Sequence, residues 1–240
     1  MNISQKKLEK SKGRLEIKIK DQNLQKLYQQ GSLKALMPDF HENLKQLMLI
    51  NTAGGITSGD EYDFKFEIDS SNLCISTQAA EKIYSGFGNP ANLEININLL
   101  NNSNLLLCEN IIFGRTSMKE EFETGYFSDF WNINIDKKLI HTEAINTGLF
   151  EKKYFNSFST LNNNSAVATI IIVGNKFLNN VNNLSETLTN NENTTSNYSQ
   201  WDNKLIVRLL SKDSYNLKFA IDKILSYFFE GSKIPKVWNI

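Results

Sequence analysis

The sequence predicts a mainly β protein with two α-helices near its C-terminus. In the first two thirds of the 240-residue chain, apolar and polar residues alternate in short segments, which is the period of a strand with one buried face. The last third instead carries continuous apolar β-branched runs, typical of strands buried on both faces. It also carries apolar residues at steps of three and four, as one face of a helix does.

The alternation is clearest in four segments. They are LEIKIK (15–20), YDFKFEID (62–69), LEININL (93–99) and WNINID (131–136). LCISTQAA (73–80) is less regular but is also predicted to be a strand. The residues DKK separate WNINI from LIHTEA (139–144), which predicts a hairpin.

The C-terminal part, 166–240, is predicted to run strand, helix, strand, helix. Its two strands are AVATIIIV (166–173) and LIVRLL (205–210), and its first helix covers 177–189. The polar segment TNNENTTSNYSQ (189–200) is expected to be a loop.

Ser214 is the expected N-cap of the second helix, which covers 214–229. No linker composition interrupts residues 1–176. The sequence therefore predicts one domain over 1–240.

Composition excludes several classes of function. The 26 basic and 26 acidic residues give a net charge of zero, whereas a protein that binds duplex nucleic acid needs a basic surface. The N-terminal residues lack the apolar segment of a secretory signal, and the apolar run 166–173 is too short to span a membrane. The only cysteines, Cys74 and Cys108, form neither a disulfide framework nor a CxxC motif. We expect a cytoplasmic protein that binds neither nucleic acid nor membrane.

The segment NTAGGITSGD (51–60) follows the apolar run LMLI and is rich in glycine. A P-loop would need a Gly-Lys-Ser/Thr ending, and this segment has no lysine. A dinucleotide fingerprint would need GxGxxG at the start of a helix, whereas the spacing here is GGxxxG and a strand is predicted to follow. On local evidence alone, a glycine turn between strands is the favoured interpretation.

His141 and Glu143 are the one metal-ligating pair that the spacing indicates. Residues two apart on a strand share a face, so an imidazole and a carboxylate placed in this way could hold a divalent ion. A solvated strand face is the plainer alternative. His41 stands alone, and the neighbours Glu81 and Lys82 are expected to form an exposed pair of little energetic value. With two histidines and no carboxylate couple, the sequence does not indicate an enzyme.

Two motifs in the right order give the sequence a family resemblance. The first runs from LMLI through NTAGGITSGD and includes the residues Asn51, Thr52, Gly54, Gly55, Gly59 and Asp60. The second, ISTQAAEKIYSG, follows about seventeen residues later and includes Thr77, Gln78, Ala79, Ala80, Lys82 and Tyr84. Together they resemble the hallmark motifs of the urease accessory protein UreD family, also called UreH.

Three further segments resemble the same family. They are LYQQGSLKALMP (27–38), FGRTSMKEEFETGYFSDFWNI (113–133) and IPKVWNI (234–240). One departure stands out, because members of the family usually carry a longer stretch between the counterparts of Leu107 and Ile111. Any role that the family assigns to that stretch is in doubt for this chain.

The resemblance implies a scaffold rather than an enzyme. UreD proteins act with the accessory proteins UreF and UreG, dock on apo-urease and help to insert nickel into its active site. The family fold is a stack of β-sheets with a helix-like winding and helices near the C-terminus. No tightly bound cofactor is implied, only nickel in transit.

The resemblance also suggests a role for the candidate residues. NTAGGITSGD is expected to form a tight turn in the stack with Asp60 beside an internal passage, and Asp60, Glu143 and His141 could pass a hydrated cation along it. Two alternatives remain open from the sequence. One is a β-rich interaction module without a metal role, and the other is a nucleotide-dependent enzyme that uses the glycine loop.

Overall fold

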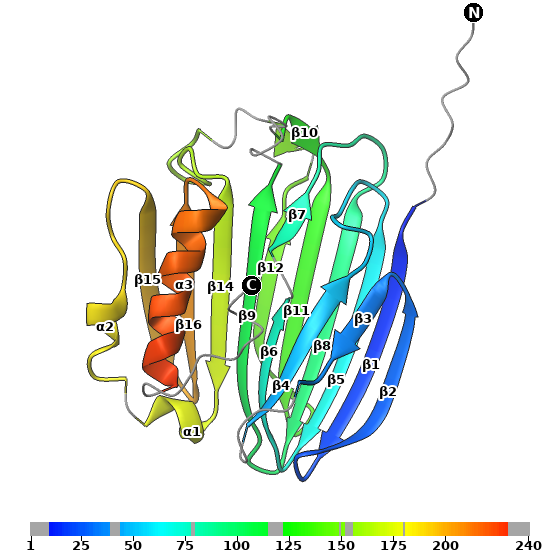
Figure 1. Ribbon diagram of the computed structural model, residues 1–240, viewed down its shortest axis with the longest axis vertical. Coiled ribbons are helices and arrows are strands. Elements are labelled where there is room, and N and C mark those ends of the chain that lie inside the picture. Colours follow the sequence, from blue (N-terminus) through cyan, green and yellow to red (C-terminus); the bar gives the residue numbers. More distant parts are fainter. Residues whose placement is uncertain are drawn as a thin grey trace, which may run out of the picture.

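The computed structural model describes residues 10–38, 44–77, 80–114, 122–148, 150–151, 156–179 and 181–229. Strands dominate these residues, as predicted. Two large sheets pack face to face, and one long helix, α3, lies against strands β14 and β16 at one side of the molecule (Figure 1).

The first sheet has six strands in the order β12-β11-β8-β5-β1-β2. Their bounds are β1 Lys12–Lys20, β2 Asn23–Gly31, β5 Glu61–Asp69, β8 Ala91–Leu100, β11 Phe127–Ile135 and β12 Lys138–Asn146. β1, β5, β8 and β11 are the four alternating segments of the sequence, and they pair in parallel as direct neighbours. The predicted hairpin at 136–138 is confirmed, because β12 pairs antiparallel with β11.

The second sheet has eight strands, in the order β15-β16-β14-β9-β6-β4-β3 with β7 beside β9. Their bounds are β3 Leu33–Leu36, β4 Lys45–Asn51, β6 Asn72–Thr77, β7 Glu81–Ile83, β9 Asn104–Phe113, β14 Ala166–Val173, β15 Thr194–Trp201 and β16 Lys204–Ser211. A separate pair joins β10 Thr124–Gly125 to β13 Phe150–Glu151.

The chain winds between the two sheets in stacked coils. β4, β6 and β9 are parallel in the second sheet, and β5, β8 and β11 alternate with them along the chain as parallel strands of the first. Each turn of the winding therefore adds one strand to each sheet. This arrangement confirms the expected β-helix-like stack.

Two apolar clusters hold these layers together. The larger lies between the sheets and includes the fully buried Trp131 and Phe127. The smaller lies between the outer face of the second sheet and α3, whose residues Leu217, Ile221 and Ile224 are buried against it.

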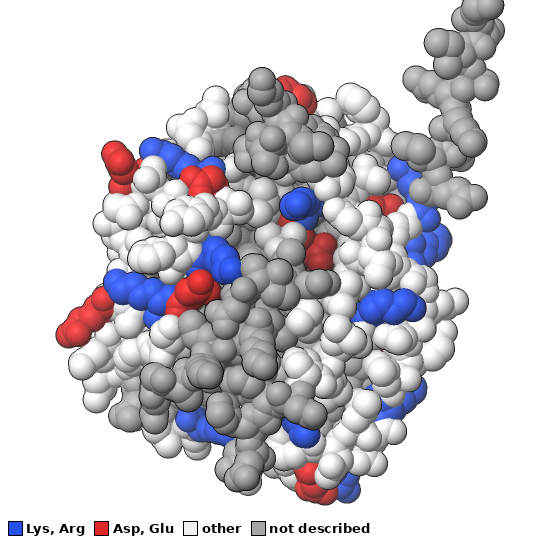
Figure 2. Space-filling model, in the orientation of Figure 1, with Lys and Arg blue, Asp and Glu red and all other residues white. Residues whose placement is uncertain are grey.

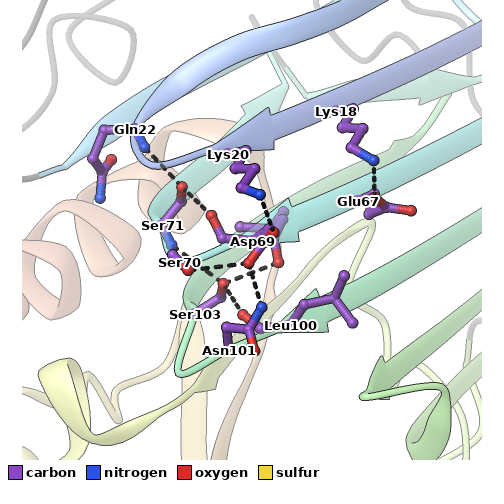
Figure 3. A network of polar contacts seen from close by, with 11 residues as sticks. Lys18, Lys20, Gln22, Glu67, Asp69, Ser70, Ser71, Leu100, Asn101 and Ser103 are labelled. Atoms are coloured by element: carbon purple, nitrogen blue, oxygen red, sulfur yellow. Dashed lines mark hydrogen bonds and ion pairs between the residues drawn. The ribbon is translucent and has the colours of Figure 1, made fainter.

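Polar side chains join the corners at which the coils turn (Figure 3). The carboxylate of Asp69 accepts a hydrogen bond from Asn101 Nδ2 at 2.7 Å and lies 3.7 Å from Lys20 Nζ. Ser103 Oγ donates to the carbonyl of Ile68 at 2.9 Å, which ties the β8–β9 corner to the end of β5. The hydrogen bond from Asn101 is the main reason why the pKa of Asp69 lies below its ordinary value.

The second predicted helix is confirmed with a different cap. α3 spans Ser214–Phe228, and its N-cap is Asp213, whose side chain accepts a hydrogen bond from Asn216 N at 2.8 Å. Ser214 is therefore the first helical residue and not the cap.

The helix expected over 177–189 is wrong in extent. Two single-turn helices take its place, α1 Asn175–Leu178 and α2 Leu184–Thr187. The intervening asparagines are poor helix formers because their side chains compete for backbone hydrogen bonds. The apolar stripe still buries Phe177 and Leu184 without a continuous helix.

The loop expected at 189–200 is also wrong, because most of it is the edge strand β15. Among the described residues, β15 pairs with one strand only, β16. As an edge strand it can therefore have a largely polar sequence. Side chains of the same chain cover outward backbone groups of this edge: Asn190 Oδ1 accepts from Ser196 N and Asn191 Oδ1 from Thr194 N, both at 2.9 Å.

Candidate functional site

NTAGGITSGD is the corner by which the chain passes from β4 to β5. Asp60 is 2% exposed, and both of its carboxylate oxygens are occupied. Oδ1 accepts a hydrogen bond from Ser11 N at 2.8 Å, and Oδ2 accepts one from Thr57 N at 2.9 Å. These contacts favour a role for Asp60 in shaping the turn, and its expected place beside a passage stays a prediction.

The two family motifs lie side by side on neighbouring coils. Tyr84 OH donates to the carbonyl of Gly54 at 2.8 Å, and the backbones of Ile56 and Tyr84 are joined by a hydrogen bond of 2.8 Å. A Cβ on Gly55 would stand only 2.3 Å from the Tyr84 ring, so glycine is needed for this close approach. Lys82 accepts a hydrogen bond at its carbonyl from Ile56 N, and its side chain is exposed.

The remaining motif residues have local structural contacts. Asn51 Oδ1 accepts from Ala53 N at 3.0 Å, and Thr52 Oγ1 donates to a carbonyl of the β2–β3 connection at 2.9 Å. Gly59 has φ +85°, which favours glycine. Thr77 Oγ1 donates to Asn110 Oδ1 at 3.1 Å. Gln78, like Ala79, His41 and the segment 234–240, lies outside the described residues.

Glu81 occupies the point where these two motifs meet the interior. It is half-buried rather than exposed, which corrects the expected surface pair with Lys82. A cavity of about 230 Å³ lies beside it, lined by Asn51, Gly54, Gly55 and Lys82 among others. Burial raises the pKa of Glu81 to about 7, with a smaller contribution from the negative charge of Asp129.

Two further carboxylates, Glu109 on β9 and Asp129 on β11, project from opposite sheets into the space between them. They are 5% and 1% exposed. Burial is the main cause that raises the pKa of both groups, and each also senses the negative charge of Glu143. Trp131 Nε1 donates to Asp129 Oδ1 at 3.0 Å, and the side chains of Asp129 and Glu109 form a hydrogen-bonded carboxyl pair, which lowers the pKa of Asp129 and raises that of Glu109. Glu109 and Asp129 therefore form a buried carboxyl pair that favours one shared proton over two negative charges.

Glu143 and His141 share the inward face of β12, as their spacing predicts. His141 Nε2 lies 3.4 Å from Glu143 Oε2. Arg208 on β16 binds both oxygens of Glu143, at 2.9 and 2.8 Å. Burial would raise the pKa of Glu143, but the hydrogen bonds from His141 and Arg208 outweigh it and lower that pKa.

A second cavity adjoins Glu143. It has a volume of about 450 Å³, its lining is mostly apolar, and it lies between β12 and the strands β14 to β16. Nearby, the buried Lys204 Nζ donates to the carbonyl of Ile140 at 2.7 Å and lies 4.6 Å from the centre of the Trp201 ring. These contacts tie β16 to the edge of the first sheet.

Glu81, Glu109, Asp129 and Glu143 thus form an electrostatically linked series, which we call the acidic chain. It begins beside one cavity and ends beside the other. Within the described part of the chain, no three His, Cys, Asp or Glu side chains converge closely enough to hold a metal ion.

Sequence reasoning placed Glu143 and His141 correctly on one face but missed Glu109 and Asp129. The signal was present, because each is the single charged residue at an inward position of an apolar strand. Asp129 alternates with Phe127 and Trp131, and Glu109 with Leu107 and Ile111. Strand parity alone could therefore have indicated that both carboxylates are buried.

Comparison with known proteins gives the family. The sequence model of the "UreD urease accessory protein" family matches residues 11–100 and 90–239. A relative from Rhizobium leguminosarum bv. trifolii, named "Urease accessory protein UreD", is 28% identical over 264 residues, which cover 95% of this chain and 94% of the relative. "Urease accessory protein UreD 1" of Brucella abortus is 26% identical and covers 95% and 93%.

A mostly β stack with two hallmark motifs on adjoining coils describes an accessory protein of the urease type. The chain belongs to the UreD urease accessory protein family. The aligned length of 264 residues exceeds the 240 residues of this chain, so the relative carries residues that this chain lacks. The two family matches overlap at 90–100, within β8, whereas β9 runs without a break through Leu107–Ile111.

No described helix has the length and apolar character needed to cross a membrane.

Proposed function

We propose that this protein assists urease maturation as a non-enzymatic scaffold. In this proposal it assembles with UreF and UreG, docks on apo-urease and conducts nickel through its interior toward the urease active site. The family match supports the role in urease maturation. The acidic chain is the observation that carries the finer proposal.

The presence of four neighbouring carboxylates inside a protein requires an explanation, because it is unfavourable for folding. Burial of each charge is costly, and their mutual repulsion adds to the cost. Arg208 offsets the charge of Glu143 at one end, whereas Glu109 and Asp129 have no cationic partner among the described residues. Perturbed carboxylates of this kind cluster at functional sites. A cation that passes between them would relieve the repulsion.

Transit requires weak binding at each step. Carboxylates with raised pKa values hold protons until a divalent ion displaces them, so entry of the ion releases protons. Glu81, whose pKa of about 7 leaves it partly ionised near neutral pH, is the suitable entry group. At the other end, His141 and Glu143 combine an imidazole and a carboxylate, which suit a borderline ion such as nickel once the ion displaces Arg208 from the carboxylate.

A paired amide substitution tests this route. Glu109→Gln together with Asp129→Asn keeps the shape of both side chains and removes their charge. Urease co-expressed with its accessory proteins should then contain less nickel and show lower activity, while the complex with UreF, UreG and apo-urease still forms. The matched control is Glu61→Gln, at an exposed residue paired with Lys12 on the outer face.

The outcomes separate the proposals. If the nickel content of urease is unchanged in the paired variant, the acidic chain is not the route, and the alternative of a β-rich interaction module without a metal role gains support. If the wild-type protein forms no complex with any of these partners, the scaffold role itself fails.

A further inference from the structure

Within the described residues, Glu143 is the one member of the acidic chain that an arginine or a lysine binds. Two nitrogens of the Arg208 guanidinium donate to its two oxygens, at 2.9 and 2.8 Å, so both oxygens are covered at once. The side chain of Glu143 is 10% exposed, whereas that of Arg208 is 56% exposed. The arginine therefore reaches this end of the acidic chain from the solvent side.

A second cation of β16 shows, by contrast, that Arg208 is able to move. The side chain of Lys204 is 6% exposed, and its ammonium group contacts the carbonyl of Ile140 and the ring of Trp201. More than half of the Arg208 side chain instead reaches solvent. The cavity of about 450 Å³ that Glu143 and Arg208 both line leaves space beside the pair, and water can hydrate the guanidinium once it leaves the carboxylate.

The surface around α3 has no comparable arrangement of charges. On the face shown in Figure 2, the Lys, Arg, Asp and Glu side chains of the described residues are scattered among uncharged ones, and neither sign forms a continuous patch. A protein that attracts or repels ions from a distance needs such a patch. The charges that an ion meets inside the protein therefore matter more than those on this face.

We propose that Arg208 is a gate at the end of the acidic chain: its guanidinium occupies Glu143 until a divalent cation takes its place. The inference rests on the proposed function, because it takes nickel to move along the acidic chain. The exchange replaces one cation by another on the same two oxygens, and no covalent bond changes. His141 Nε2 lies 3.4 Å from Glu143 Oε2 and offers the incoming ion a ligand that a guanidinium cannot use.

The gate favours ions that bind nitrogen as well as oxygen. An incoming ion has to replace two charge-assisted hydrogen bonds between Arg208 and Glu143. Nickel gains both the carboxylate and the imidazole of His141, whereas magnesium prefers oxygen ligands and loses its water reluctantly. Arg208 thus sets a threshold of affinity that nickel reaches and magnesium does not.

The test measures the affinity of the full-length protein for Ni²⁺ by titration calorimetry at one pH. Arg208→Ala should bind Ni²⁺ about tenfold more tightly than the wild type, because the ion no longer competes with two charge-assisted hydrogen bonds. Ethylguanidinium, which can enter the space left by the side chain, should weaken binding to Arg208→Ala and leave the wild type unchanged.

Two further variants complete the experiment. Arg208→Lys keeps the charge but not the two-point contact, so its affinity should be intermediate, and it tests the gate even if Arg208→Ala does not fold. The matched control is Arg14→Ala, which removes another partly exposed arginine that contacts carboxylates, those of Glu16 and Asp63 on the outer face of the first sheet. This control should bind Ni²⁺ as the wild type does.

The outcomes separate the gate from the route. If Ni²⁺ binds the Arg208 variants no more tightly than the wild type, Arg208 is only a structural link between β12 and β16. A gain that persists in Arg208→Ala/Glu143→Gln also overturns the gate, because the ion then binds elsewhere. Neither result contradicts the route, which the paired substitution of Glu109 and Asp129 tests through the nickel content of urease. If that pair leaves nickel delivery unchanged while Arg208→Ala gains affinity, the route fails and the exchange at Glu143 stands.

Discussion

Asp60 and Asp129 are both buried aspartates, but their surroundings are opposite. Asp60 closes the NTAGGITSGD corner, where two backbone N–H groups donate to its two oxygens. Asp129 lies in the acidic chain, where Trp131 donates to one oxygen and the other partner is a second carboxyl group, Glu109. Asp129 also lies near Glu109 and Glu143, which are carboxylates themselves.

The difference teaches that burial alone does not identify a functional carboxylate. A buried acid that accepts backbone hydrogen bonds stabilises the fold, because its charge compensates donors that would otherwise be unpaired. A buried acid surrounded by other acids destabilises the fold and is retained for another reason. Three substitutions of buried acids test this distinction, and a fourth, at Gly55, tests the contact between the two motifs.

Asp60→Ala should be the most damaging change to the fold. It leaves Ser11 N–H and Thr57 N–H without acceptors, and hydrogen bonds to a charged group are each worth about 1.5–3 kcal/mol. We expect a loss of about 3 kcal/mol in the free energy of unfolding, or roughly 6–12 °C in Tm for a chain of this size. Chemical denaturation measures it. If the variant is as stable as the wild type, the Asp60 carboxylate does not stabilise the fold.

Asp129→Asn should have the opposite effect and increase the free energy of unfolding. The amide keeps an acceptor for Trp131 Nε1 and removes a buried charge, so we expect the variant to gain about 1 kcal/mol at pH 8 and little at about pH 3, where the acid is mostly protonated in both states. Denaturation curves at the two pH values measure the difference. A loss of stability at pH 8 would show that the Asp129 carboxylate stabilises the fold, as Asp60 is expected to.

The raised pKa of Glu81 predicts how this residue makes the stability of the fold depend on pH. Folding raises the pKa of Glu81 from 4.5 to about 7, so the folded state holds a proton that the unfolded state releases within that window. The contribution of Glu81 to the free energy of unfolding should therefore fall as the pH rises from about 4.5 to 7 and level off above. Glu81→Gln should make this slope shallower, and an unchanged slope would contradict the assignment.

Gly55→Ala should cost the least, about 1 kcal/mol, because the Tyr84 ring can rotate away at the expense of its hydrogen bond to Gly54. Thermal unfolding of Gly55→Ala and of Tyr84→Phe compares the cost of the steric clash with the cost of losing the hydrogen bond to Gly54. If Gly55→Ala loses nothing, the close approach of the two motifs is not what requires glycine there.

Much of the fold could be predicted because strand periodicity is a local property. LEIKIK, YDFKFEID, LEININL and WNINID each show the alternation, and all four became neighbours in one sheet. Their parallel pairing could not be read from the alternation, because it depends on the path of the chain between them. The helix-like winding implied by the family resemblance was the one expectation that bore on it.

The wrong or missing predictions also concern features that are not local in the sequence. The polar residues of β15 look like a loop because an edge strand needs no apolar partner on its free side, and its asparagines satisfy the backbone there instead. For the site, the His141 and Glu143 spacing was sufficient for a local pair. Glu109 and Asp129 come from different sheets, and Arg208 comes from 65 residues beyond Glu143. Only the folded chain brings these groups together.

The coiled winding also has a consequence for the length of the chain. Each coil pairs with the coil before it and the coil after it, so one coil can be lost or gained without disturbing the pairing of distant coils. This explains how a chain can be shorter than its aligned relatives and still keep both hallmark motifs on adjoining coils. In such a stack, the length of the chain can change by one coil at a time, as the number of repeats changes in a solenoid.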